Sequence, residues 1–237
     1  MLAIFRKELN SFFSSPIGYL VIGVFLVTNG LFLWVFKGDF NILDAGFADL
    51  NSFFFIAPWF FLFLIPAITM RSFSDEYRLG TIEILKTKPI TNWQIINGKF
   101  FGALALILLT LIPTLIYIFS INTLGGEIGV LDSGSTLGSY IGLLFLASTY
   151  TSIGLFTSTL SNNQIVSFIL AVIICFLFYY GFDAFADFNI ISGIENLGMK
   201  SHFDSISRGV VDTRDLVYFI STTLFFLILT HLKLTQE

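Results

Sequence analysis

The chain has 237 residues, of which 55% are hydrophobic and only 12% are charged, and its mean hydropathy is +0.86. Such a composition is typical of an integral membrane protein and excludes a soluble globular enzyme or binding domain. The acidic balance, a formal net charge of −4, argues against a nucleic-acid partner.

Six apolar stretches are long enough to cross a bilayer core of ~30 Å, which takes about 20 helical residues. We therefore expect an all-α integral membrane protein with six transmembrane helices, over 16–36, 52–70, 100–121, 137–157, 164–182 and 216–231. Because these stretches take up most of the chain, residues 1–237 are treated as a single transmembrane domain.

The basic residues set the expected orientation. If the N-terminus is cytosolic, 8 of the 12 Lys and Arg residues lie on the cytosolic side, together with only 5 of the 16 acidic ones. Cytosolic loops are enriched in Lys and Arg. We therefore expect a multi-pass protein of the bacterial inner (cytoplasmic) membrane with both termini in the cytosol.

Residues 1–15 precede the first span and carry apolar residues at helical spacing: Leu2, Phe5, Leu9, Phe12 and Phe13. This pattern predicts an interfacial helix lying on the cytosolic leaflet. Pro16 then allows a sharp turn into the membrane, because the residue before a proline avoids helical geometry. The alternative is a simple N-terminal extension of the first span.

The second span contains Pro58 and Pro66. Prolines inside a span bend it and free backbone carbonyls, which is common in helices that move or line a path. Kinks of purely structural origin explain the two prolines equally well.

The segment 71–99 is the one long charged stretch of the chain. Ser74 is a suitable N-cap, and Asp75 and Glu76 follow it where negative charge suits the helix dipole, which predicts a short helix over 74–87. An apolar stripe at three-residue spacing would dock one face of this helix: Leu79, Ile82 and Leu85. The segment is either an ordinary solvated loop between two membrane spans or the part of the chain that carries its function.

A second helix is predicted to follow that segment's proline, Pro89. Thr91 and Gln94 have the spacing of a capping box, so this helix should begin at Thr91 and lead into the third span.

The fourth span begins with Gly138 and Gly142 in a G-x-x-x-G arrangement and carries several Ser and Thr residues. Small and hydroxyl-bearing residues allow close helix packing, which we favour over a polar translocation path. A short uncharged turn at 161–164 then offers a second, smaller cytosolic contact. The outer segment 183–211 is too apolar for a solvated loop, and it predicts short helices lying on or re-entering the outer leaflet.

Several kinds of chemistry lack support in the sequence. It has no G-x-x-x-x-G-K-[ST] nucleotide motif, no H-E-x-x-H motif and a single cysteine, Cys175, so we assign no catalytic, cofactor-binding or metal-binding residue. The six predicted spans contain no Asp, Glu, Lys or Arg, which disfavours an ion-coupled carrier. The energy for any transport should then arrive through the cytosolic face.

Three separated runs resemble the ABC-2-type permeases of ABC transporters and together cover essentially the whole chain: SDEYRLGTIEILKTKPITNWQIINGKF, IGLFTSTLSNNQIVSFI and SHFDSISRGVVDTRDLVYFIS. The resemblance implies a six-span permease subunit that pairs with a second permease chain, identical or related, and with two copies of a separate ATPase that holds the ATP and Mg. It also implies a coupling helix whose role falls on Asp75, Glu76, Tyr77, Arg78, Leu79, Gly80, Thr81 and Glu83.

Within this family the chain is most similar to gliding-motility-associated permeases of the GldF type. These are associated with a GldA-like ATPase and a GldG-like membrane-anchored partner, and with export or gliding motility. One departure from the family is the turn at 161–164, which has Ser-Asn where the family frequently has an acidic or Thr-Glu pair. The competing hypothesis is a membrane scaffold or motor anchor for an ATPase, without solute flux.

Overall fold

The computed structural model describes residues 1–45, 49–124, 131–187 and 194–236, and the secondary structure in these ranges is helical, with no strand among them. Within the same ranges, six segments are long and apolar enough to cross a membrane: Pro16–Val35, Asn51–Arg78, Asn92–Leu124, Ser133–Ser158, Gln164–Ala186 and Thr213–Gln236. The predicted all-α membrane fold with six spans is therefore confirmed.

The spans are built from the longer helices, some of them joined end to end. The first combines α2 (Pro16–Gly30) with the π-helical turn η1 (Leu31–Val35), and the second runs from α4 (Asn51–Thr69) into α5 (Arg71–Arg78). The third combines α7 (Asn92–Leu111), the 3-10 turn η2 (Ile112–Thr114) and α8 (Leu115–Leu124). The fourth is α9 (Ser133–Ser158), the fifth joins α10 (Gln164–Phe176), η3 (Leu177–Gly181) and α11 (Phe182–Asp187), and the sixth is α13 (Thr213–Gln236).

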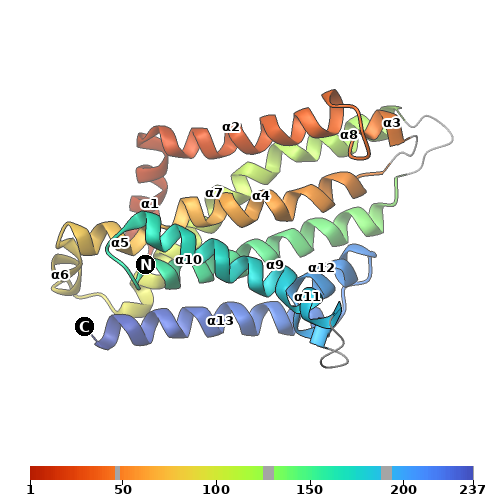
Figure 1. The fold of residues 1–237 in the computed structure, drawn as a ribbon. Helices are drawn as coiled ribbons and strands as arrows, with labels where there is room; N and C mark the ends of the chain where they lie inside the picture. Colours follow the sequence, from red (N-terminus) through yellow and green to blue (C-terminus); the bar gives the residue numbers. More distant parts are fainter. Residues whose placement is uncertain (46–48, 125–130, 188–193, 237) are drawn as a thin grey trace.

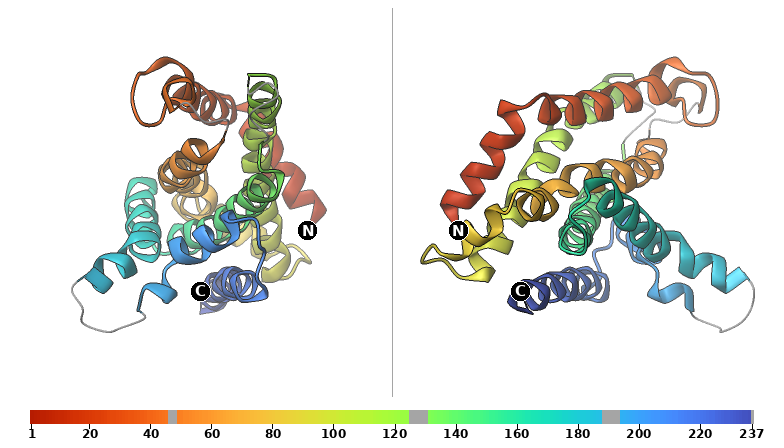
Figure 2. Two further views of the ribbon diagram at one scale, coloured as in Figure 1. Left: turned by 90° about the vertical axis from the view of Figure 1, so that its right-hand side faces the viewer. Right: turned by 60° about the vertical axis from the view of Figure 1, so that its left-hand side comes forward.

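The shorter helices gather at the two ends of the bundle. One end carries α1 (Leu2–Ser14), α5, α6 (Thr81–Lys86) and both chain termini, while α3 (Ile42–Ala45), α11 and α12 (Met199–Ser207) lie at the opposite end (Figure 1). α2 and α13 lie at opposite edges of the bundle, with α4, α7 and α9 between them (Figure 2).

α1 runs across the end of the bundle instead of continuing the line of α2 (Figure 1). Ser15 between them has an extended backbone, with φ −109° and ψ 156°, and Pro16 is the first residue of α2. Pro16 suits this position because a helix makes no use of the N–H of its first residue. The separate N-terminal helix is thus present, and the alternative of a simple extension of the first span is wrong.

α9 is the central helix and packs against α4, α10, α12 and α13. Its glycines sit where neighbours approach closely: a Cβ added at Gly154 would overlap Oγ1 of Thr69 on α4, and one at Gly142 would lie 3.0 Å from the ring of Phe203 on α12. Four buried hydroxyls of α9 donate to carbonyls of their own helix, those of Thr151, Ser152, Thr157 and Ser158. The structure thus supports packing as the role of these residues.

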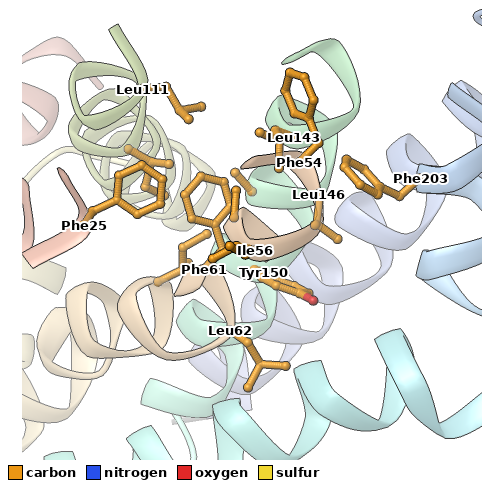
Figure 3. Packing of buried hydrophobic residues seen from close by; sticks show 14 of the residues in the cluster. Phe25, Phe54, Ile56, Phe61, Leu62, Leu111, Leu143, Leu146, Tyr150 and Phe203 are labelled. Atoms are coloured by element: carbon orange, nitrogen blue, oxygen red, sulfur yellow. The ribbon is translucent and has the colours of Figure 1, made fainter. Parts of the chain in front are cut away.

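The apolar core joins helices from both halves of the chain. Figure 3 shows side chains of α2, α4, α7, α9 and α12 converging, among them Phe25, Phe61, Leu111, Leu146 and Phe203, all of them buried. The rings of Phe25 and Phe61 stack with their centroids 5.4 Å apart. Because lipid tails are as apolar as these side chains, close packing and not expulsion of water holds such helices together.

The segment after the second span differs from the prediction. One helix was predicted over 74–87, capped by Ser74, but Ser74 lies buried inside α5 and its hydroxyl donates to the carbonyl of Met70. Gly80, with a φ of 67°, then separates α5 from α6. Only glycine adopts this left-handed backbone at little cost, which explains why the helix breaks there.

The helix that leads into the third span begins where it was predicted, but the candidate span of the structure starts before residue 100. The capping box formed by Thr91 and Gln94 is present, with the backbone N–H of Gln94 donating to the Thr91 hydroxyl. α7 begins immediately after it at Asn92, so Lys99 lies inside this helix as predicted, whereas the membrane span itself was predicted to begin only at residue 100.

The prolines of the second span leave α4 continuous through both Pro58 and Pro66. In the third span, by contrast, η2 contains Pro113 and interrupts the α-helix between α7 and α8.

The outer segment 183–211 contains the short helices α11, η4 (Ile194–Leu197) and α12, and residues 188–193 lie outside the described ranges. α12 packs against α9 through the buried side chains of Met199, Phe203 and Ile206. Its re-entry into a membrane stays a prediction.

Candidate functional site

The end of the bundle that carries both termini projects a small helical tip made of α5, the Gly80 turn and α6 (Figure 1). The inner side of this tip is apolar: Ile82 is buried in a cluster with Ile4, Phe73 and Ile95. Its outer side presents Leu79, 67% exposed, and Ile84, 61% exposed. Leu79 was predicted to lie in the docking stripe with Ile82, but the break at Gly80 turns it outward.

The residues predicted to form the coupling segment divide between the two sides of the tip. Five lie on its exposed side: Arg78, Leu79, Gly80, Thr81 and Glu83. Asp75 and Tyr77 are half-buried, and Glu76 is only 8% exposed. The structure therefore brings most of the predicted segment to one surface but places Glu76 inside the protein, where it cannot make a surface contact.

Asp75 links the tip to the short turn between the fourth and fifth spans. Its Oδ1 accepts a hydrogen bond from Nη2 of Arg78 at 2.8 Å and another from Nε2 of Gln164 at the start of α10. A cleft of about 340 Å³ lies beside this contact, lined by Arg78, Asn162, Asn163, Gln164 and Ile165. The turn predicted to be a second contact on this side thus adjoins the tip and forms one continuous surface with it.

Glu76 points into a buried cluster of charges centred on Lys99 of α7. The Lys99 side chain is 1% exposed, and its Nζ lies 2.8 Å from Oε1 of Glu76 and 3.0 Å from Oε1 of Glu8 on α1. The same ammonium group donates to the backbone carbonyl of Ser72 at 2.7 Å and lies 5.0 Å from the centroid of the Phe73 ring. Its three protons therefore all have acceptors, as a buried ammonium group requires.

A fourth charge completes the cluster from the solvent side. Nζ of Lys7 lies 3.0 Å from Oε1 of Glu76 and 4.0 Å from Oε1 of Glu8. Burial acts to lower the pKa of Lys7, but the attraction and the hydrogen bond of Glu76, with help from Glu8, outweigh it and raise this pKa above its ordinary value of 10.5. Two Lys and two Glu thus balance one another in a joint of α1, α5 and α7, which we call the Lys99 cluster.

The Lys99 cluster was not predicted, although the sequence holds a signal for part of it. Gly98 and Gly102 form a G-x-x-x-G pair on α7, and it is here that α1 crosses: a Cβ at Gly98 would lie 2.8 Å from Cβ of Ile4, and one at Gly102 would lie 2.8 Å from Cβ of Glu8. Such pairs mark close helix crossings. Nothing local to the sequence, however, indicates which helix crosses there.

The predicted spans contained no charge, but the candidate spans of the structure are longer and include charged residues, three of them buried: Glu76, Lys99 and Asp215. Lys99 lies in α7 and Asp215 in α13, both buried, whereas the predicted spans began immediately after each of them. Both stand close to the beginning of their helices, and both have charged or titratable partners, the glutamates for Lys99 and His202 for Asp215.

Comparison with known proteins gives one family match. The model of a family described as ABC-2 family transporter protein matches residues 2–232. A comparison with curated proteins gives no match.

Proposed function

The chain belongs to the ABC-2 family of transporter proteins, and we propose that a separate ATPase subunit drives it by docking on the tip formed by α5 and α6. Membrane subunits of this family are non-catalytic and imply an ATPase partner. The protein is thus a multi-pass membrane subunit in which movement, not chemistry, is the contribution of the chain.

The observation that carries the docking proposal is the exposed apolar pair Leu79 and Ile84 on the tip. The two residues sit beside the polar and charged residues Arg78, Thr81 and Glu83, at a bundle end that also carries both termini. An apolar side chain that faces lipid needs no explanation, but Leu79 lies in the turn after α5 and Ile84 on the short helix α6, both with polar neighbours. Apolar residues rimmed by polar ones are the usual composition of a protein-binding surface.

The cleft beside Gln164 extends this surface toward the fifth span. Because Asp75 is hydrogen-bonded to both Arg78 and Gln164, the tip and the turn at 161–164 are fixed relative to each other. An ATPase that holds the tip would therefore also meet Asn162 and Asn163.

The basic residues support a cytosolic position for this end of the bundle. Arg71, Arg78 and Lys99 are all carried by α5 and α7 there, and Arg6 and Lys7 by α1. Since cytosolic ends are rich in Lys and Arg, we propose that the tip and both termini face the cytosol, in a bacterial inner membrane.

The finer assignment follows the likeness to permeases of the GldF type. We propose two copies of a GldA-like ATPase, a second permease chain and a GldG-like membrane-anchored partner, with ATP hydrolysis serving export or gliding motility. ATP and Mg would be bound by the ATPase. A difference in ATPase contacts between two arrangements of the spans would shift their populations and so move the permease.

Copurification tests the docking proposal. The native chain should retain a protein that carries the G-x-x-x-x-G-K-[ST] motif, and the double variant Leu79→Asp/Glu83→Lys should lose it, because it places a carboxylate in the apolar contact and reverses a charge beside it. Asp39→Lys, an exposed acid near the opposite end, is the matched control. Equal retention of the ATPase by the double variant and the control would refute docking at the tip.

A further inference from the structure

The Lys99 cluster joins three segments that are far apart in sequence, and it does so at the base of the tip. Glu8 and Lys7 come from α1, Glu76 from α5 and Lys99 from α7. Each ion pair between helices therefore crosses a boundary between two of these three elements.

Burying these charges is not the simplest way to hold three helices together. Removing charges from water carries a large cost, and well-packed apolar residues in the same place are often as stabilising or more so. Two of the three contacts already have close apolar packing, with Ile4 of α1 against Gly98 and Phe73 of α5 in the cluster with Ile95 and Ile96. The charges must contribute something that apolar packing does not.

What the charges contribute is a defined geometry between the helices. Apolar contacts are non-directional and allow helices to slide, whereas charge-assisted hydrogen bonds have short, defined geometry. Oε1 of Glu76 lies 2.8 Å from Nζ of Lys99 and 3.0 Å from Nζ of Lys7, so α5 is held in register with α7 and α1 at once.

α1 connects the Lys99 cluster to the first span. At its far end α1 meets α5 again, where the guanidinium of Arg71 lies 5.2 Å from the ring centroid of Phe12. After the extended residue Ser15, α1 leads into α2 and the first span, Pro16–Val35, which stands at the edge of the bundle and has 28% of its most apolar 18-residue stretch buried. A displacement of α5 that α1 follows would therefore reach a lightly packed span.

We propose that Lys99 is a positioning residue that makes α1 and α7 follow α5, so that a movement imposed on the tip reaches the first and third spans. The proposal rests on the proposed function, because it needs an ATPase that moves the tip. Lys99 is buried and acts through Glu76 and Glu8.

The test uses pairs of spin labels in the permease assembled with its ATPase in lipid nanodiscs. Cys175→Ala removes the native thiol, and cysteines are introduced at the exposed positions Asn10 on α1, Thr87 after α6 and Leu232 on α13. Distances are compared without nucleotide and with ATP, Mg and vanadate.

In the chain with an intact Lys99 cluster, the distance 10–87 should stay the same in both states while 10–232 and 87–232 change together. In Lys99→Met/Glu8→Gln/Glu76→Gln, the distance 87–232 should still differ between the two states. The distance 10–232 should no longer differ, and the distance 10–87 should therefore change. A second variant, Lys7→Met/Glu76→Gln, leaves Lys99 paired with Glu8 and should separate the movements in the same way, which keeps the test available if the triple variant folds poorly.

The control is Lys200→Met/Asp183→Asn, which removes an ion pair of 2.7 Å at the opposite end and should leave the movements linked. Linked movement in both cluster variants would overturn the role of Lys99 while leaving the proposed function intact. If 87–232 does not change with nucleotide in the intact chain, the proposed function itself fails, and the role of Lys99 fails with it.

Discussion

Replacing Lys99 alone should destabilise the protein strongly. Lys99→Met removes the ammonium group that lies within 3.0 Å of both Glu8 and Glu76 and leaves these two carboxylates buried. Breaking a buried ion pair by removing one partner costs about 3–5 kcal/mol. Because Lys7 still pairs with Glu76, we expect the lower end of that range, about 3 kcal/mol. For a chain of this size each kcal/mol lowers the midpoint of thermal unfolding by roughly 2–4 °C, so the expected shift is about 6–12 °C.

The assay is thermal unfolding of the purified protein in detergent, with two comparison variants. Lys99→Met/Glu8→Gln/Glu76→Gln removes the stranded carboxylates as well and should recover most of the lost stability, since the uncompensated charge is the source of the cost. Lys200→Met breaks a pair that is about one-third exposed and should cost only about 0–1 kcal/mol. If Lys99→Met is no less stable than the triple variant, the claim that Lys99 neutralises buried carboxylates is refuted.

Two further predictions concern packing and pH. Gly154→Ala should cost about 1–3 kcal/mol by overpacking, because the new Cβ would overlap Oγ1 of Thr69, and adding Thr69→Ala should recover part of this in the same unfolding assay. Equal stability of Gly154→Ala and the native chain would contradict the close approach of α4 and α9. The pKa of Lys7 is raised in the folded state, so its pairing with Glu76 contributes stability that is fully present below pH 10.5 and lost as the pH rises through the raised pKa. Lys7→Met should therefore be less stable than the native chain at pH 8, and the difference should shrink above pH 10.5; a difference that grows with pH would contradict this assignment.

Features that depend on neighbouring residues were predictable from the sequence. The six apolar stretches give the spans, the spacing of Thr91 and Gln94 gives the capping box, and Gly142 marks a close contact of α9. In each case the signal and the structure lie within a few residues or within one helix, so no knowledge of distant partners is needed.

Features that depend on tertiary partners were not predictable in this way. Ser74 is a good N-cap by type, but here the second span continues past it and its hydroxyl bonds back to Met70, a competing use that Ser has inside helices. Glu76 was expected at the surface because the resemblance to ABC-2-type permeases placed it in the coupling segment. Its partners, Lys99 and Lys7, lie 23 and 69 residues away in sequence, and only the fold brings them together.

The most direct test of the account is site-specific photocrosslinking from the tip in intact cells. A photoreactive residue at Ile84, 61% exposed on the tip, should crosslink to a chain that mass spectrometry identifies by the motif G-x-x-x-x-G-K-[ST]. The same residue at Leu197, 56% exposed at the opposite end, should give no such product. Crosslinking of the ATPase from Leu197 and not from Ile84, or equally from both, would contradict docking on the tip.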